Sequence, residues 1–504
     1  MFRPLFVLLA TLLLSSAAET ATGVVFHDQN NNGQRDAGER GIANVRVSNQ
    51  QTVVTTDAKG RWQLPATDDC IFFVIKPSGW KTPLNDHRLP QFHYLHKPKG
   101  SPKLRFLGVK PTGPLPRSID FPLTPQKEPD TFKAIFFGDP QPRTQQQIDY
   151  IAHDVVEELV GTEAKFGVTL GDILFDDLSL FPSMNATVAL VGIPWYNVIG
   201  NHDVNREAKQ DHLSDETFER IYGPPYYSFD YGKVHFIVLD NVLWTAGRYV
   251  GGLGEKQLAF VKSDLQHVPK DRLVVLMMHI PLTGTTDRQE LYRLIEKRPY
   301  TLSLSGHTHT QEHHFIGKND GWKGARPHHH IVNVTVSGSW WKGAKDELNI
   351  PHTMMRDGAP NGYSTITFDG HNATFDFKAS RRPADYQMNI QAPEVVTAAT
   401  ASSTAIHVNV FSGSSKSIVQ FRVSDGDWIK MRKIHAKDPL YSMIRQRDLQ
   451  NFPKAPALNG PVDSTHLWQA NLPAGIKPGS HLIHVQTKDM YGREFRAQRV
   501  LRVN

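Results

Sequence analysis

Three absences narrow what this protein can be. The 504 residues contain one cysteine, Cys70, which excludes an intramolecular disulfide and zinc sites that need two or more cysteines. Lysine and arginine (56) outnumber aspartate and glutamate (50) only slightly, and this dispersed net charge of +6 does not indicate a nucleic-acid partner. After the first residues, no apolar run approaches the about 20 residues that a membrane-spanning helix needs.

Histidine, by contrast, is abundant. The chain has 24 histidines, and its length suits about three domains of ordinary size. With 39% hydrophobic and 21% charged residues, the composition is that of an ordered globular protein. Imidazole, not thiol, is therefore the side chain with which this protein would bind metals or transfer protons.

The first residues carry a targeting pattern. Met1-Phe2-Arg3 precedes an apolar run from Leu5 to Leu14 and the small residues Ser15-Ser16-Ala17-Ala18. A charged start, a short apolar core and a small-residue cleavage site are typical of a secretory signal peptide. We predict that residues 1–18 are removed near Ala18 and that the protein is exported, to the periplasm or outside the cell.

The rest of the chain divides into three units by its patterning. Residues 19–109 alternate short β-rich runs with Gly, Asn and Asp turns, which predicts an N-terminal β-sandwich. Residues 110–130 are rich in proline and are expected to be a linker. In residues 131–385 apolar strands alternate with helical patterns, which predicts an α/β domain. Residues 386–504 return to β patterning and predict an all-β domain.

Polar residues follow five of the strands predicted in the α/β domain. Because ligands bind beyond the carboxyl ends of strands in such sheets, we expect these residues to converge on one site. Glycines beside them let the backbone turn so that the next side chain faces the crevice. Carboxylates combined with neutral imidazole and amide ligands suit two divalent ions about 3.5–4 Å apart. The residues concerned are Asp139, Gln141, Asp172, Asn201, His202, Asp203, His279, His307 and His309.

In order and spacing these residues resemble the signature of the calcineurin-like metallophosphoesterases. Gly171-Asp172, Gly200-Asn201-His202-Asp203, the isolated His279 and Gly306-His307-Thr308-His309 match blocks of that family. The resemblance implies a two-sheet sandwich flanked by helices, in the exported subset that carries a prealbumin-like N-terminal domain and a C-terminal β-domain. It also implies ligand roles: Asp139 and His309 on the first metal, Asn201, His279 and His307 on the second, and Asp172 bridging both.

Gln141 departs from the family pattern, which has histidine at this position. Its amide oxygen is neutral like an imidazole nitrogen, so the charge of the site is unaltered, but the ligand is harder and weaker for Zn²⁺. Manganese or iron then become more suitable occupants than zinc. Two alternatives stay open, namely that Gln141 holds a metal-bound water or that it does not ligate.

The resemblance implies an exported, dimetal-dependent hydrolase of small or medium phosphate esters, with a diester favoured over a monoester. A metal-bridging hydroxide would attack in line, with His202 as general acid or charge stabiliser. Asp203 would orient a nearby imidazole. Two other functions stay open: a nucleotidase or nucleotide-sugar pyrophosphatase, and a non-catalytic surface protein that binds a glycan or envelope component. The oligomeric state is not indicated.

An oxygen-rich loop in the N-terminal unit suggests a second kind of metal site. Oxygen ligands at loop positions 1, 3, 5, 9 and 12, with glycine at position 6, suit Ca²⁺. The flanking segments are strand-like, so the loop resembles calcium loops of bacterial β-modules rather than a helix-loop-helix hand. An asparagine-rich turn without metal is the alternative. The candidate ligands are Asp28, Asn30, Asn32, Asp36 and Glu39.

Further aromatic, basic and histidine residues remain to be placed. The aromatic and basic residues near the predicted site could bind the leaving group or a second phosphate of the substrate. Alternatively, they could serve only turn formation and core packing. The candidates for substrate binding are Arg143, Trp340, Trp341, Arg356, Asn361 and Tyr363. His328, His329 and His330 are expected to be solvated or hydrogen-bonded rather than a third metal site. Trp428, Tyr441 and Trp468 are expected to be core or interdomain anchors rather than a carbohydrate platform.

Overall fold

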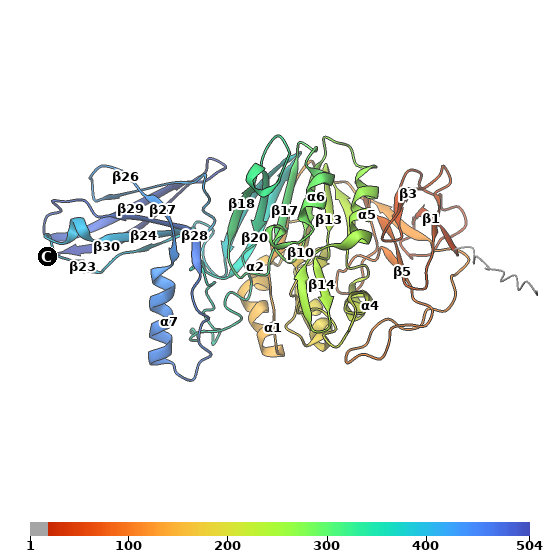
Figure 1. Cartoon of the computed structure of the whole chain (residues 1–504), viewed down its shortest axis with the longest axis horizontal. Coiled ribbons are helices and arrows are strands. Elements are labelled where there is room, and N and C mark those ends of the chain that lie inside the picture. Colours follow the sequence, from red (N-terminus) through yellow and green to blue (C-terminus); the bar gives the residue numbers. More distant parts are fainter. Residues whose placement is uncertain (1–18) are drawn as a thin grey trace, which may run out of the picture.

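The computed structural model describes residues 19–504, so the signal peptide predicted over residues 1–18 lies outside the described residues. The molecule is elongated, with the N-terminal strands at one end, the C-terminal strands at the other and the α/β region between them (Figure 1). Within residues 19–504, the structure has no helix that combines the length and the apolar character needed to cross a membrane.

Two four-stranded sheets form the N-terminal unit. One sheet has the order β4 (Arg61–Pro65), β1 (Thr20–His27), β8 (Phe121–Pro125) and β6 (Trp80–Lys81). The other has the order β3 (Val53–Thr55), β2 (Arg46–Ser48), β5 (Cys70–Ile75) and β7 (His93–His96). Side chains alternate between core and solvent along β4, where Trp62 and Leu64 are buried.

The proline-rich segment is not the plain linker predicted for residues 110–130. Strand β8 lies inside it and pairs in parallel with β1, with Phe121 opposite Val25. Phe121 and Leu123 are 4% and 0% exposed and belong to the core. Burial of these two apolar side chains explains why the segment is a strand although Pro122 and Pro125 cannot donate hydrogen bonds.

The central region contains two larger sheets. The five-stranded sheet has the order β11 (Trp195–Val198), β10 (Phe166–Leu170), β9 (Thr131–Phe137), β20 (Gly362–Asp369) and β21 (Asn372–Ala379). The six-stranded sheet has the order β12 (Tyr227–Tyr231), β13 (Val234–Val238), β16 (Leu273–Met277), β17 (Thr301–Ser305), β19 (His328–Val332) and β18 (Glu312–Ile316). A hairpin of β14 (Val242–Thr245) and β15 (Arg248–Gly251) stands apart from both.

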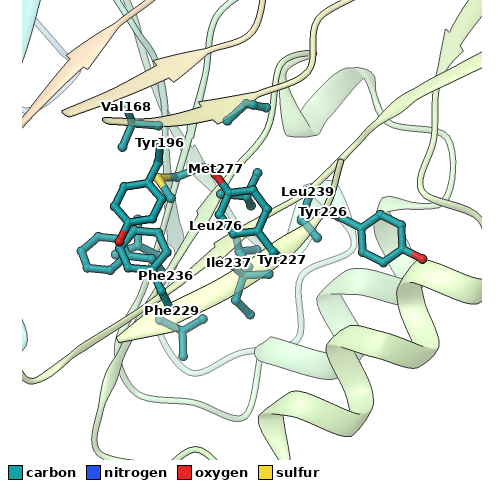
Figure 2. Packing of buried hydrophobic residues seen from close by; sticks show 14 of the residues in the cluster. Val168, Tyr196, Tyr226, Tyr227, Phe229, Phe236, Ile237, Leu239, Leu276 and Met277 are labelled. Atoms are coloured by element: carbon teal, nitrogen blue, oxygen red, sulfur yellow. The ribbon is translucent and has the colours of Figure 1, made fainter. Parts of the chain in front are cut away.

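The two central sheets pack against each other through apolar and aromatic side chains. Figure 2 shows Val168 and Tyr196 of the first sheet facing Phe229, Phe236 and Met277 of the second. The rings of Tyr196 and Phe229 stack with centroids 4.0 Å apart. This sandwich fixes the strand ends on which the candidate site is built.

Helices cover the outer faces of the sandwich. Ile135 and Phe137 of β9 pack in one buried cluster with α1 (Gln145–Ile151), a π-turn at Ala152–Val156, α2 (Glu157–Leu159) and α3 (Phe181–Ala189). On the other sheet, α5 (Gly254–Leu265) and α6 (Arg288–Ile295) place Phe260 and Leu291 in the cluster of β13 and β16. The short helix α4 (Glu216–Tyr222) precedes β12. The predicted helix-flanked, two-sheet α/β fold is confirmed.

The C-terminal unit is a second β-sandwich with one helix that the all-β prediction did not include. One sheet has the order β22 (Met388–Gln391), β24 (Ala405–Val410), β28 (Asp463–Asn471) and β27 (Arg432–Lys437). The other has the order β23 (Val395–Val396), β30 (Glu494–Val503), β29 (Gly479–Lys488), β25 (Ile418–Val423) and β26 (Ile429–Lys430). Helix α7 (Pro439–Asn451) begins at the cap Asp438, whose carboxylate accepts a hydrogen bond from the backbone N–H of Tyr441.

Candidate metal centre

The five predicted strand ends converge at one edge of the sandwich. Asp139, Asp172 and Asn201 follow the parallel strands β9, β10 and β11, and His279 and His307 follow the parallel strands β16 and β17. The glycines beside them are required by close packing. A Cβ on Gly306 would lie 2.3 Å from Asp139 Oδ2, and one on Gly171 would lie 2.5 Å from His279 Nδ1.

The backbone at this edge is strained at the predicted ligands. Asp139 (φ 40°), Gln141 (φ 41°), Asp172 (φ 49°), His307 (φ 77°) and His309 (φ 56°) all adopt the left-handed conformation. This conformation is uncommon for residues other than glycine and costs of the order of 1 kcal/mol each. Strain concentrated on the side chains that carry the chemistry supports a functional origin for the arrangement.

Asp172, His279 and His307 form the one three-residue group in residues 19–504 whose His, Cys, Asp or Glu ligand atoms all lie within 4.8 Å of one another. His279 Nδ1 lies 2.9 Å from the carbonyl oxygen of Leu170, to which it donates. Its Nε2 then points at three acceptor atoms: Asp172 Oδ1 at 3.2 Å, Asn201 Oδ1 at 3.1 Å and His307 Nδ1 at 3.1 Å. Lone pairs facing one another in this way require a positive charge between them.

The pKa values of the two histidines also indicate that this group needs a positive charge. Burial lowers the pKa of His279, but the charge and hydrogen bond of Asp172 outweigh it and raise that pKa to about 9. Burial, with repulsion from His279, lowers the pKa of His307 to about 4, so its ring stays neutral. Without a metal, the group takes up a proton to balance Asp172. A divalent cation bound by neutral imidazoles and a carboxylate supplies that charge, so the residues fit a metal.

The predicted ligands of the first metal lie beside this group. His309 Nδ1 donates to the carbonyl oxygen of Gly338 at 2.5 Å, so Nε2 faces Asp139 Oδ1 at 3.7 Å. Gln141 Nε2 donates to Asp172 Oδ2 at 2.5 Å. Among the described residues, the buried Oε1 of Gln141 has no hydrogen-bond partner. A cation between Asp139 and His309 would satisfy that orphaned oxygen, which makes Gln141 suitable as a ligand or as a holder of a metal-bound water.

His202 is positioned by an aspartate that sequence reasoning missed. Asp176 Oδ1 lies 2.7 Å from His202 Nδ1, and the backbone N–H of His202 donates to Asp172 at 2.9 Å. Burial lowers the pKa of His202, but Asp172 and Asp176 together raise it above its ordinary value. No sequence pattern distinguishes Asp176 from the neighbouring Asp177. Its left-handed backbone, with φ at 64°, appears only in the structure.

The role predicted for Asp203 is wrong. Its buried carboxylate contacts no imidazole within the described chain and accepts the backbone N–H groups of Ile173, Leu174 and Gly200. The bonds from Ile173 and Leu174 tie the loop after β10 to the loop after β11, and the bond from Gly200 closes a turn within the second loop. Asp203 therefore helps to position Asp172 and Asn201, because its bonds hold the backbone next to both residues.

Two of the six candidate substrate-binding residues lie at the centre. The Arg143 guanidinium stacks 3.6 Å from the Phe175 ring centroid, and Phe175 stacks on the imidazole of His202 at 4.1 Å. Trp340 stacks on the imidazole of His309 with centroids 3.8 Å apart. Phe175 and Trp340 thus each cover one candidate histidine and are themselves half-buried.

The other four candidates have structural partners. Trp341 is buried and donates to the carbonyl oxygen of Pro140, and Tyr363 is buried beside Phe137. Asn361 is also buried and donates to Asp154 Oδ2 at 3.0 Å. Arg356 donates to the carbonyl oxygen of Gly460 in the C-terminal unit. Core packing and turn chemistry, the alternative stated for these four residues, account for their positions.

The candidate calcium loop closes on itself through hydrogen bonds. Asn30 and Asn32 each donate to Asp36 Oδ2 at 2.8 Å, and Asp28 accepts the backbone N–H groups of Asn32 and Gly33. Glu39, at the last loop position, accepts the N–H groups of Gln29 and Asp36. The five side chains therefore share one small loop.

The histidine run is hydrogen-bonded, as expected. His328 and His330 share the buried face of β19 and both contact Ser303 Oγ, while His329 lies on the other face next to His313.

Of the three aromatic residues predicted as anchors, Tyr441 and Trp468 are buried, at 0% and 2% exposure. Trp428 is 37% exposed, so the prediction is wrong for this residue.

Family models match three stretches of the chain: "N terminal of Calcineurin-like phosphoesterase" at residues 29–110, "Calcineurin-like phosphoesterase" at 132–311 and "C terminal of Calcineurin-like phosphoesterase" at 330–495. A curated relative, "Probable inactive purple acid phosphatase 9" of Arabidopsis thaliana, is 27% identical over 193 residues, which are 32% of this chain and 28% of the relative. A solved structure, purple acid phosphatase PPD1 from yellow lupin (Lupinus luteus) seeds, is 12% identical with a TM-score of 0.35, covering 68% of this chain and 69% of that one. Because the three family models follow one another in the expected order, the chain belongs to the calcineurin-like phosphoesterase family.

Proposed function

We propose that the protein is a metal-dependent phosphoester hydrolase that acts on small or medium phosphate esters and prefers diesters. The observation that carries the proposal is the convergence of His279 Nε2, Asp172, Asn201 and His307 on one point that requires a positive charge. When bound, two divalent ions of manganese, iron or zinc would neutralise phosphate charge and activate the attacking water.

The protein residues have distinct roles in this proposal. Asp172 would serve both cations, with Asp139, Gln141 and His309 on one side and Asn201, His279 and His307 on the other. Asp172 and Asp176 raise the pKa of His202, which favours its protonated form, so the ring is suited to protonate the leaving oxygen or to stabilise the charge on phosphorus. Asp203 keeps the two ligand loops in register.

The aromatic rim supports the preference for a diester. A diester carries an organic group on each of two ester oxygens, whereas a monoester carries only one. Phe175 beside His202 and Trp340 beside His309 offer two separate apolar surfaces, and a cation accompanies each ring, Arg143 at 3.6 Å and Lys342 at 5.9 Å. A diester with an organic group on each side of its phosphate would contact both aromatic surfaces, whereas a monoester would contact one of them.

Metal exchange and one substitution test this proposal. The protein is dialysed against chelator and supplied with Mn²⁺, Fe²⁺, Zn²⁺ or Ca²⁺, and hydrolysis of bis-p-nitrophenyl phosphate is compared with that of p-nitrophenyl phosphate. We expect activity to disappear and return, with kcat/KM higher for the diester. Asp172→Asn should abolish activity, whereas Asp271→Asn on the exposed surface should not.

Three outcomes would contradict parts of the proposal. Full activity after chelation would exclude the metal mechanism. Higher kcat/KM for nucleotides or nucleotide sugars than for simple diesters would favour the nucleotidase or pyrophosphatase alternative. Absence of hydrolysis with every metal, together with retained binding of envelope material by Asp172→Asn, would favour a non-catalytic surface protein.

Two further assignments accompany this function. We propose that the Asp28–Glu39 loop binds one structural Ca²⁺, supported by its ligand spacing and by the hydrogen bonds that bring its oxygens together. Calcium should then raise the Tm of the wild type but not of Asp28→Asn.

We also propose that the protein is exported, on the pattern of residues 1–18. N-terminal sequencing of the mature protein should begin near residue 19, and an intact Met1 would contradict it.

A further inference from the structure

The outer face of the C-terminal five-stranded sheet carries a groove of about 500 Å³, far along the chain from the metal ligands. Most of its lining residues lie on β25, β29 and β30. These strands belong to the C-terminal unit, which is at the end of the molecule opposite the N-terminal unit (Figure 1). The inner face of the same strands is apolar and packs into the C-terminal core, where Phe421, Ile483 and Val485 are buried. Val485 and Ala497 form the floor of the groove and belong to or pack on this core, whereas the polar residues of the lining point outward and are not part of it.

The strand register arranges the outward side chains in two rows. Trp428 lies beside Arg422, which is opposite His484, which in turn is opposite Gln498. In the adjacent row, Gln420 is opposite Gln486, and Gln486 is opposite Arg496. The Gln486 amide donates to Gln420 at 3.2 Å, which holds that pair in place. The result is a polar grid with one indole at its edge.

The two arginines give the groove a positive charge. Arg422 stacks on Trp428 at 5.0 Å, and among the described residues its buried Nε has no hydrogen-bond partner. Arg496 lies at the diagonal corner of the grid, about 12 Å away by strand geometry. The groove's lining contains no carboxylate. Three exposed carboxylates lie nearby without lining the groove: Asp425 and Asp427 in the β25–β26 turn, and Glu494, whose Oε2 is 3.8 Å from the Arg496 guanidinium. Water screens that exposed contact, so Arg496 keeps most of its charge for a ligand.

We propose that this groove binds an acidic polysaccharide that carries carboxylate groups. A guanidinium matches a carboxylate through two parallel hydrogen bonds, and both cations in the lining are arginines rather than lysines. Glutamine amides and an imidazole both donate and accept, which suits sugar hydroxyls. The exposed edge and face of Trp428 suit the apolar face of a sugar ring.

The ligand must be an oligomer, and it must be a glycan. One uronic acid carries one carboxylate, so the two arginines on opposite corners need charges on different sugar units. Single-stranded nucleic acid is less suitable, because its binding sites stack successive bases on several aromatic rings, and this groove has one. This assignment does not depend on the proposed hydrolysis.

Binding of the full-length protein to immobilised alginate oligomers, which are polymers of uronic acids, tests the inference. Neutral dextran, dextran sulfate and oligothymidylate serve as comparison ligands. We expect salt-sensitive binding to alginate that is at least tenfold tighter than to the other three. Trp428→Ala and the double substitution R422Q/R496Q should each weaken it about tenfold or more. Arg502→Gln, on the same strand as Arg496 but outside the groove, is the matched control and should bind like the wild type.

Several results would overturn the inference. Equal binding to alginate, dextran sulfate and oligothymidylate, unaffected by the groove variants, would show general attraction to the net positive chain. Tighter binding to oligothymidylate that the same variants abolish would show a nucleic-acid surface. If the wild-type protein does not bind alginate although its Tm shows that it is folded, the groove does not bind such polymers.

Discussion

In the proposed mechanism, proton delivery by His202 depends on Asp176, the carboxylate that contacts its ring. We predict that Asp176→Asn lowers kcat about tenfold or more while KM changes little, because the ring loses the partner that holds it and its proton. The pKa of His202, which Asp172 and Asp176 raise, should fall in this variant. The decline of kcat at alkaline pH should therefore begin at lower pH. Steady-state kinetics across pH measures both effects.

Leaving groups of different basicity separate this role from a structural one. Loss of a general acid slows esters of weakly acidic alcohols more than esters of nitrophenol. A uniform loss across leaving groups would mean that Asp176 serves only the fold. Asp177→Asn is the matched control, since Asp177 bonds to Ser179 in the following turn and not to His202.

If Gln141 is a ligand, as proposed, it should set the metal preference of the first site. We predict that Gln141→His raises the affinity for Zn²⁺ about tenfold or more relative to Mn²⁺, because imidazole is the softer ligand. Histidine tolerates the left-handed backbone at this position better than most residues. Competition with a chromogenic chelator measures the affinities. Gln146→His, an exposed histidine nearby, should leave them unchanged, and an unaltered preference in Gln141→His would show that residue 141 does not ligate.

The sequence predicts the residues at the centre better than their supports. Strand-end glycines and the spacing of Asp172, His202 and His307 identify the edge at which they meet. Asp176 and Asp203 are both carboxylates in loops, and sequence alone cannot say which one faces a ring and which one faces backbone N–H groups. That choice depends on how two loops lie side by side, which is a tertiary property.

At the scale of elements, a buried charge cluster joins the N-terminal unit to the central sheet and α5. Arg46 of β2 forms ion pairs with Asp230 of β12 at 2.6 Å and Asp264 of α5 at 2.8 Å. His235 of β13 lies between the same carboxylates, with Nδ1 2.8 Å from Asp230 and Nε2 3.0 Å from Asp264. Because both ring nitrogens face acceptors, His235 is an imidazolium in the folded protein.

This cluster makes stability depend on pH. Burial lowers the pKa of His235, but Asp264 and Asp230 outweigh it and raise that pKa above the unfolded value of about 6.5. The stabilisation is complete below about pH 6.5 and is lost as the pH rises through the folded pKa. We predict that the free energy of unfolding decreases from pH 7 upward, by at most about 1.4 kcal/mol per pH unit for one proton. Urea unfolding from pH 6 to pH 9 measures it.

A neutral side chain at position 235 provides the comparison. His235→Asn should be less stable than the wild type at pH 6 and should lack this part of the slope. Parallel curves for the two proteins would assign the pH dependence to other groups. Variants at Arg46 are less informative here, because removing Arg46 takes a buried positive charge from both carboxylates and leaves only His235 and Arg272 to balance them.

The sequence predicts helices and strands well where one face of a segment is apolar. It predicts them less well where contacts with other segments determine the structure. Periodicity predicts a helix over 255–265 and a strand over 418–423, which agree nearly to the residue with α5 and β25. The apolar pattern predicts a strand only from Ile331, whereas β19 begins at His328, because serine hydroxyls satisfy imidazoles that the pattern treats as polar. Helix α7 lacks a single apolar face, although its Asp438 cap and the following Pro439 are a start signal that the sequence does contain.

At the scale of the whole molecule, the C-terminal unit reaches the metal centre through a chain of hydrogen bonds. His309 donates to the carbonyl oxygen of Gly338, and the next residue, Ser339, contacts the hydroxyl of Tyr441 on α7 at 3.1 Å. Tyr441 also donates to the carbonyl oxygen of Asn459 at 2.8 Å. The orientation of one predicted ligand is thus tied to a helix that lies outside the central sandwich.

Removing the Tyr441 hydroxyl tests this link between the two units. We predict that Tyr441→Phe weakens metal binding at the Asp139 and His309 side about fivefold, the equivalent of one hydrogen bond worth about 1 kcal/mol. At saturating metal, kcat should stay close to that of the wild type, because no group that touches substrate has changed. Metal titration followed by activity measures both quantities. Tyr386→Phe, in a ring that packs on Phe411 in the same unit, should leave the titration unchanged. A lower Tm for Tyr441→Phe with unaltered metal affinity would show that α7 supports only the stability of the 337–341 segment and not the geometry of His309.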